Sequence, residues 1–181
     1  PSRYNYPTVD GRLVRTGNSP SIDPGPPDTF ASVDIAWANV NNTPFRLFKH
    51  FTHEGGISTP FIISWPDGVA DKGSVFNNPA HLIDINATLL DLAGATYPGT
   101  FKGNDIKPAE GESFSSVLKG ENWERDKPIG WEHEGNRAVR MGDWKLVSEI
   151  GDPADPDSKA DWELYNIRDD RTELNDLIDE E

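Results

Sequence analysis

The fold class of this chain is decided by residues 42–56, which read Asn42-Thr43-Pro44-Phe45-Arg46-Leu47-Phe48-Lys49-His50-Phe51-Thr52-His53-Glu54-Gly55-Gly56. Two basic residues, two histidines and a carboxylate are crowded there between aromatic side chains, and an apolar segment over residues 57–65 follows at once. Such a segment predicts a buried strand, because strands covered on both faces show a continuous apolar run. A charged loop at the edge of such a strand is a usual place for a small-ligand site in an α/β fold.

The residues after this strand predict one amphipathic helix. A turn at residues 66–68 ends the strand, and Asn78 followed by Pro79 is a typical helix start. Gly94 supplies the C-terminal stop. Apolar residues at helical spacing predict its buried face, and they are Leu82, Ile85, Leu89 and Leu92.

Towards the C-terminus the pattern changes to antiparallel strands. Alternation with a period of two predicts a hairpin of residues 137–141 and 144–150 around Gly142-Asp143, and residues 162–165 add a further strand. Tryptophans that fall in strands are expected in the core. They are Trp65, Trp144 and Trp162.

Loops divide the chain. Residues 1–36 are rich in proline and glycine and predict an extended surface loop, and residues 95–112 are again rich in turn-forming residues. The second loop indicates a boundary, so we expect one domain over 1–104 and a small antiparallel β subdomain over 105–181. Two short helices are expected, over residues 113–118 and 172–177.

Composition limits the partners and the chemistry. A net charge of −14 argues against nucleic acid or an anionic membrane as a partner. No apolar stretch approaches the roughly 20 residues of a membrane span. The absence of cysteine excludes disulfides and zinc–thiolate sites. Hydrophobic residues make up 35% of the chain, which is low for a domain that packs only on itself.

Three blocks in the same order resemble the sulfatase family, and within it the bacterial arylsulfatases of the alkaline phosphatase superfamily. Lys49 stands five residues before Glu54-Gly55-Gly56, residues 81–94 look like the helix of the family, and residues 132–147 look like its C-terminal hairpin. The resemblance extends over roughly residues 30–177. It implies an α/β fold: the C-terminal part of an alkaline-phosphatase-like sulfatase fold, followed by a small antiparallel sheet with a helix.

The resemblance also implies parts that this chain lacks. Sulfatases carry a Cys-or-Ser-x-Pro/Ala-x-Arg signature whose first residue becomes the formylglycine nucleophile, and no such signature occurs here. The calcium ligands of the family would lie upstream of this segment, and no metal ligand is expected within it. We therefore expect the C-terminal portion of a sulfatase, inactive by itself, whose partners are a missing N-terminal segment and a sulfated small molecule or glycan.

Four residues are candidates for the site. The resemblance implies that Lys49 points at the sulfate group, where a fixed ammonium would stabilise anionic oxygens. His50 and His53 could donate to sulfate or carry a proton, and His133 could touch the organic part of the substrate. Each of the three histidines could instead be structural. Arg46 and Glu54 are expected to hold the loop in shape, and Asp84 to hydrogen-bond a neighbouring loop.

Two other functions remain open from the sequence. One is a phosphonate or phosphate monoester hydrolase of the same superfamily, because the residues that choose between sulfate and phosphate are absent. The other is a non-catalytic module that binds sulfated glycans through scattered aromatic residues. Neither the particular ester nor the compartment follows from the sequence. A periplasmic or secreted location is favoured only because many members of the family act outside the cytoplasm.

Overall fold

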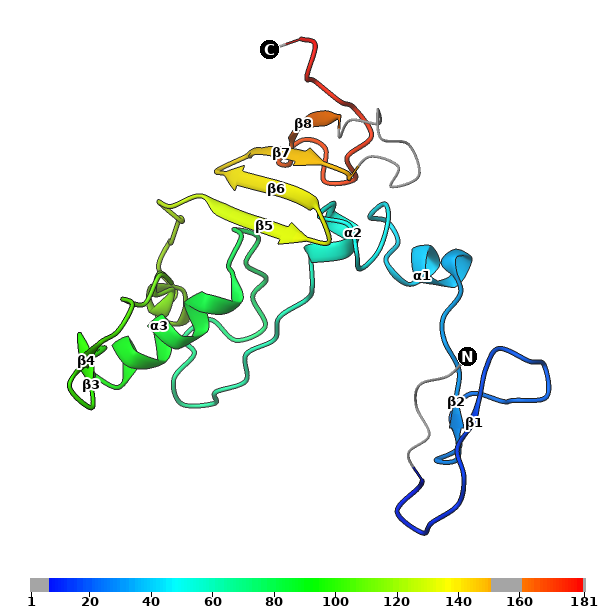
Figure 1. Cartoon of the computed structure of the whole chain (residues 1–181). Helices are drawn as coiled ribbons and strands as arrows, with labels where there is room; N and C mark the ends of the chain where they lie inside the picture. The colour runs from blue at the N-terminus through cyan, green and yellow to red at the C-terminus, as the bar shows by residue number, and fades with distance from the viewer. Residues whose placement is uncertain (1–6, 151–160, 181) are drawn as a thin grey trace.

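The computed structural model describes residues 7–150 and 161–180, and its central element is a four-stranded antiparallel sheet (Figure 1). Each strand pairs with the next along the chain, in the order β5-β6-β7-β8. The strands are β5 Ile129–His133, β6 Asn136–Met141, β7 Trp144–Ser148 and β8 Trp162–Asn166. The predicted hairpin and the strand after it are confirmed, and the sheet gains β5, which was not predicted.

Tight turns join the first three strands. Gly142 has φ +59°, the left-handed region that favours glycine, as the predicted hairpin requires. The turn between β5 and β6 has φ +52° at Glu134 and +89° at Gly135, values typical of a type I′ turn. This turn pairs His133 with Asn136 across the hairpin.

The core lies on one face of the sheet. Its buried apolar residues are Ala138, Val147, Tyr165 and Ile167, with Trp131 packed against them. Lys145 is also fully buried on this side, two residues before Val147. The alternation predicted for β7 is confirmed, but the expected core position of Trp144 is wrong. Trp144 alternates with Lys145 and is 42% exposed, and Trp162 is exposed to the same extent.

The strand predicted over residues 57–65 is not formed. α2, a single turn over Glu54–Ile57, precedes an irregular segment in which Ile62 is 88% exposed and Trp65 is half-exposed. An apolar run becomes a strand only where a neighbouring strand offers its hydrogen bonds, and none of the described strands pairs with it. The predicted turn at 66–68 is confirmed.

The predicted amphipathic helix is α3, over Leu82–Leu92. His81 caps it instead of Asn78, because the Asp84 carboxylate accepts the His81 backbone N–H (2.7 Å) in a capping box. Gly94 ends it with φ +61°, as predicted. The buried face differs from the prediction. Polar Asp84 and Thr88 are buried, whereas the apolar face formed by Leu82, Leu89 and Leu92 is exposed.

The remaining elements are short. The helices are α1 Ile35–Asn41 and α4 Ser115–Leu118, and α4 confirms the predicted helix over 113–118. Two-stranded pairs are β1 Arg15–Thr16 with β2 Thr29–Phe30, and β3 Thr100–Phe101 with β4 Asn104–Asp105. In Figure 1 the β1–β2 pair stands apart from the sheet, joined to it through α1. The proposed boundary between 104 and 105 falls in β4, and the two-domain division stays a prediction.

The predicted helix over residues 172–177 is wrong. The chain there makes turns around Asp170, whose carboxylate accepts the backbone N–H groups of Leu174 and Asn175 (both 2.8 Å). A carboxylate that competes for backbone donors in this way favours turns over helix. The described chain is thus an α/β arrangement that ends in a small antiparallel sheet, as expected.

Candidate functional site

The loop of residues 42–53 and α2 fold into one tight unit. The backbone N–H of Gly55 donates to the carbonyl of Arg46 (3.1 Å), which turns the chain back on itself. A Cβ at Gly55 would lie 2.2 Å from that carbonyl oxygen, and a Cβ at Gly56 would lie 2.0 Å from the carbonyl oxygen of Phe51. Both positions therefore require glycine. The close approach that the Gly-Gly pair permits is to the chain's own backbone.

A buried ionic cluster fastens this unit to the sheet. The ammonium of Lys145 in β7 donates to Glu54 of α2 (3.1 Å) and to Glu173 of the C-terminal segment (2.7 Å). The second carboxylate oxygen of Glu173 accepts the backbone N–H of Glu54 (2.7 Å). All three side chains are almost completely buried. A cation shared by two carboxylates thus joins three distant segments of the chain.

A second polar cluster holds the start of the loop. The Arg46 guanidinium donates to the Tyr165 hydroxyl and to the Glu173 carbonyl (both 2.9 Å). Tyr165 donates to Glu163 (2.6 Å), and Nε2 of the fully buried His53 lies 2.9 Å from the same carboxylate oxygen. Burial opposes ionisation of Glu163, but the hydrogen bonds from Tyr165 and His53 outweigh it, so its pKa lies below the usual range.

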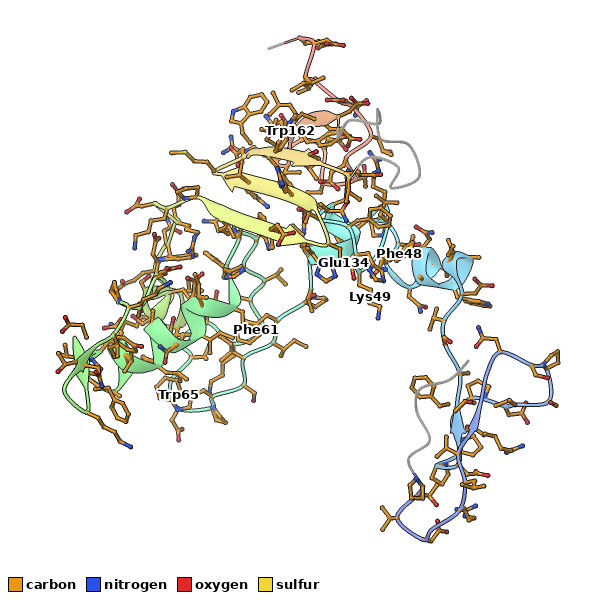
Figure 2. The ribbon with its side chains drawn as sticks, viewed as in Figure 1. Phe48, Lys49, Phe61, Trp65, Glu134 and Trp162 are labelled. Atoms are coloured by element: carbon orange, nitrogen blue, oxygen red, sulfur yellow. The ribbon has the colours of Figure 1, made fainter. Side chains whose placement is uncertain are left out.

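Between these anchors the loop presents Lys49 and His50 to solvent. Leu47 and His50 have φ values of +65° and +101°. The backbone on both sides of Lys49 is therefore held in a conformation that residues other than glycine rarely adopt. Figure 2 shows Lys49 beside Glu134, at the end of the sheet where the β5–β6 turn meets the loop. Because Lys49 is exposed, its ammonium can also meet a ligand from outside the described residues.

His50 joins the loop to that turn. Its Nδ1 lies 2.6 Å from a Glu134 carboxylate oxygen, and its ring centroid is 5.8 Å from that of His133. The buried amide of Asn136 donates to the carbonyls of both His50 (2.7 Å) and His133 (3.2 Å). The hydrogen bond and charge of His50 hold the pKa of Glu134 below its usual range, with smaller contributions from His133 and Lys49.

The structure brings together three of the four predicted site residues. Lys49, His50 and His133 lie on one exposed surface, which we call the Lys49 surface and which also includes Glu134. His53 does not belong to it, because its ring is completely buried against Glu163. The expectation that Arg46 and Glu54 hold the loop is confirmed, although each pairs with the sheet and not with the other.

Sequence reasoning did not find Glu134 or Asn136. Their only signal is Gly135, which favours a tight turn but says nothing about a loop 84 residues from Glu134. Nor did it find Lys145 and Glu173, since charged residues are normally assigned to the solvent-exposed surface. The prediction for Asp84 is confirmed, because its carboxylate accepts the Glu112 N–H (2.8 Å) and pairs with Arg125.

The Lys49 surface lies outside the cavity that the structure forms elsewhere. That cavity, of about 430 Å³, lies at the opposite end of β6, around Arg140 and the Gly142-Asp143 turn. Lys49 does not line this cavity and is exposed. A site that has to surround a sulfate group would need further walls from outside the described residues.

The comparison with known families places this loop and sheet in the C-terminal portion of a sulfatase. The family description "N-sulphoglucosamine sulphohydrolase, C-terminal" matches residues 45–181, which include most of the loop, α3 and the whole sheet. The chain belongs to this family.

Curated relatives carry sulfatase names. An uncharacterized sulfatase of Schizosaccharomyces pombe is 33% identical over 145 residues, which cover 78% of this chain and 25% of that protein. A sulfatase of Formosa agariphila is 28% identical and covers 78% and 26%. An arylsulfatase of Klebsiella aerogenes is 31% identical over 49% of this chain and 19% of its own length. The chain spans about a quarter of the length of the first two relatives.

Solved structures share less with this chain. One, described in connection with the metabolism of multiple glycosaminoglycans by Bacteroides thetaiotaomicron, has 21% identity over 53% of this chain and 20% of its own, with a TM-score of 0.39. Another, described as a complex with its substrate D-glucosamine-2-N,6-O-disulfate, has 23% identity, covers 54% and 19%, and has a TM-score of 0.35. Among the described residues no helix is long and apolar enough to cross a membrane.

Proposed function

We propose that this chain is the C-terminal part of an arylsulfatase-type sulfuric ester hydrolase, in which Lys49 binds the sulfate group of the substrate. One observation carries the proposal. In a chain that belongs to a sulfatase family, Lys49 is the exposed cation of a loop that is fastened by one buried and one partly buried polar cluster. An ammonium held in place before the substrate arrives stabilises anionic oxygens without a cost of reorganisation.

The chain's own residues would bind and orient the ester. Lys49 would contact the sulfuryl oxygens, which are anionic in the ground state and in the transition state. His50 and His133 could donate hydrogen bonds to the substrate, and Glu134 would hold the His50 ring in place through its 2.6 Å contact. The formylglycine nucleophile, which attacks sulfur in sulfatases, would come from the segment that precedes this one.

The two side-chain groups that the described residues gather do not suit calcium. Calcium takes six to eight oxygen ligands, mostly carboxylates and carbonyls. The described part of the chain gathers two groups of possible ligands, and each includes an imidazole nitrogen. We therefore propose that the calcium of the complete enzyme is held by residues outside this chain.

The test is the substitution Lys49→Ala in the full-length protein that carries this chain. We expect kcat/KM for 4-nitrophenyl sulfate to fall by about 10²–10³-fold, the loss typical of removing one preorganised group that faces developing negative charge. Lys49→Arg keeps the charge but changes its geometry, and it should lose less. Lys72→Ala removes an equally exposed lysine and should leave turnover unchanged.

Unchanged turnover in Lys49→Ala would remove the assignment. The same assay with a phosphate and a phosphonate monoester decides between sulfatase and phosphonate hydrolase. If the full-length protein turns over none of these esters but binds sulfated glycans whether or not Lys49 is present, the non-catalytic binding module is the correct function.

A further inference from the structure

The Lys49 surface holds a second chemical feature, a group of three possible metal ligands. His50, His133 and Glu134 each offer one ligand atom, and these three atoms all lie within 4.8 Å of one another. His50 comes from the loop, whereas His133 and Glu134 come from the β5–β6 turn. Two imidazole nitrogens and one carboxylate oxygen form a ligand set that zinc and other first-row divalent cations prefer.

The backbone on which these side chains stand is built in advance. Asn136 is buried, and its amide nitrogen donates to the carbonyls of both histidines, so it holds the two segments side by side. Its amide oxygen accepts the Ile150 N–H (3.0 Å), which fixes its orientation. Glu134 is the first central residue of a type I′ turn and has φ +52°. Only the three ligand side chains remain free to move.

We propose that His50, His133 and Glu134 form a site for one divalent transition-metal ion. Ligands at the bond lengths of zinc lie about 3.4 Å apart in a tetrahedron, so no two of the three atoms have to converge by more than about 1.4 Å, and His50 Nδ1 and the Glu134 carboxylate, now 2.6 Å apart, have to separate slightly. Exposed side chains can do this by small rotations, because packing does not restrain them. Three protein ligands leave at least one coordination position open to water or to an anionic group.

Of the charges around this cluster, one favours metal binding and one opposes it. Glu134 is exposed, and an exposed carboxyl, whose ordinary pKa is near ~4.3, is ionised at neutral pH, which is the form that binds a metal. Lys49 lies close enough to influence that carboxylate, and its positive charge opposes a cation at the same place. Without a metal ion, the Glu134 carboxylate contacts Nδ1 of His50. We therefore expect binding in the micromolar range, weaker than in a structural zinc site.

This proposal does not rest on the proposed function. A metal could bind here whether or not Lys49 contacts sulfate, although both proposals involve His50, His133 and Glu134. The sequence offered no signal for it, because His50 and His53 alone lack metal-ligand spacing and His133 lies far along the chain.

The first experiment titrates Zn²⁺ into the 181-residue chain by calorimetry, and into the full-length protein as a second context. Co²⁺ is added separately because its visible absorption reports nitrogen and oxygen ligands directly. We expect one equivalent to bind with micromolar affinity at neutral pH. Binding should weaken in acid, because imidazole nitrogens must be unprotonated to bind metal.

The variants are His50→Gln and His133→Gln, each expected to weaken Zn²⁺ binding at least tenfold. The matched control is His81→Asn, which removes a histidine outside the cluster and keeps a residue that caps α3 well. Far-UV circular dichroism checks that each variant is folded. Absence of stoichiometric binding in both contexts, or equal affinity in all variants, would overturn the proposal.

Lys49→Ala separates the two proposals. It should tighten Zn²⁺ binding by about threefold, because a like charge is removed, while it abolishes most sulfatase turnover. If turnover falls but no variant alters zinc binding, the metal site is wrong and the sulfate assignment stands. If zinc binding behaves as expected but turnover is unchanged, the sulfate assignment is wrong and the metal site stands.

Discussion

Two neighbouring regions of this chain differ in the kind of side chain that is buried and the kind that is exposed. Where the loop and α2 meet the sheet, the buried side chains are charged: Glu54, Lys145 and Glu173 are almost completely enclosed. Directly after α2, the apolar side chains of Phe61 and Ile62 lie mostly exposed. The usual arrangement of apolar inside and charged outside is therefore reversed across a few residues.

The difference teaches what orders each region. Paired charges with good hydrogen bonds hold distant segments in one geometry, and that geometry presents Lys49. The apolar segment has no described strand beside it, so its hydrophobicity does not produce a regular element. Three predictions, from the largest effect to the smallest, test whether this contrast is real.

Lys145→Met should break the ordered region. It leaves the carboxylates of Glu54 and Glu173 buried with no shared cation, and breaking a buried ion pair in this way costs about 3–5 kcal/mol. The free energy of unfolding, measured by urea denaturation, should fall by that amount. Lys72→Met, at an exposed lysine, is the control and should change it by less than about 0.5 kcal/mol. A loss below about 1 kcal/mol for Lys145→Met would show that the cluster does not hold the loop.

Asp84 gives a pH-dependent test of the polar contacts beneath α3. Burial opposes its ionisation, but Arg125 and the backbone N–H groups of His81 and Glu112 outweigh this and lower its pKa. A carboxyl whose folded pKa is lowered contributes stability above its unfolded value, near pH ~3.9, and loses it as the pH falls through the folded value. Asp84→Asn should therefore cost about 2–3 kcal/mol at pH 7, and less below pH ~4.

The measurement is the free energy of unfolding between pH 7 and pH 2. Asp91→Asn is the matched control, since Asp91 lies on the same helix with an exposed carboxylate that accepts from Ser113 and Ser115. Its effect should be smaller at every pH. A constant difference between wild type and Asp84→Asn across the whole range would contradict the role of ionised Asp84.

Ile62→Ser should have the smallest effect. Because Ile62 is exposed in this chain, its replacement should change the free energy of unfolding by less than about 0.5 kcal/mol. Val147→Ala in the core is the comparison and should cost about 2 kcal/mol. If the two substitutions destabilised the chain equally by urea denaturation, Ile62 would be packed and the contrast between the two regions would disappear.

The elements that the sequence predicted correctly are those with local signals. Gly142 and Gly94 need positive φ, so each marked a turn or a helix end in the right place. The start of α3 was missed by three residues, because His81 and Asp84 form a capping box that competes with the Asn78-Pro79 start. The prediction of a strand over 57–65 was wrong for a different reason. An apolar run does not show which other strand would pair with it.

The candidate site divides in the same way. Lys49 was found through its position before Glu54-Gly55-Gly56, and His50 follows it directly in the chain. The meeting of His50 with His133 and Glu134 depends on Asn136, whose amide reaches across 86 residues to the loop. His53 lies in the same loop as His50, but its buried ring contacts Glu163. No spacing rule distinguishes the two histidines.

By itself the sequence determined the resemblance to sulfatases, the hairpin, the helix and the candidate lysine, because each depends on residues close together in the chain. The tertiary structure alone decided which side of each element is buried. Lys145 lies inside and Trp144 outside, since the buried face of β7 is the one that meets two carboxylates from distant segments. Pairings of that kind depend on which segments meet in space. The alternation of apolar and polar residues along one strand does not predict them.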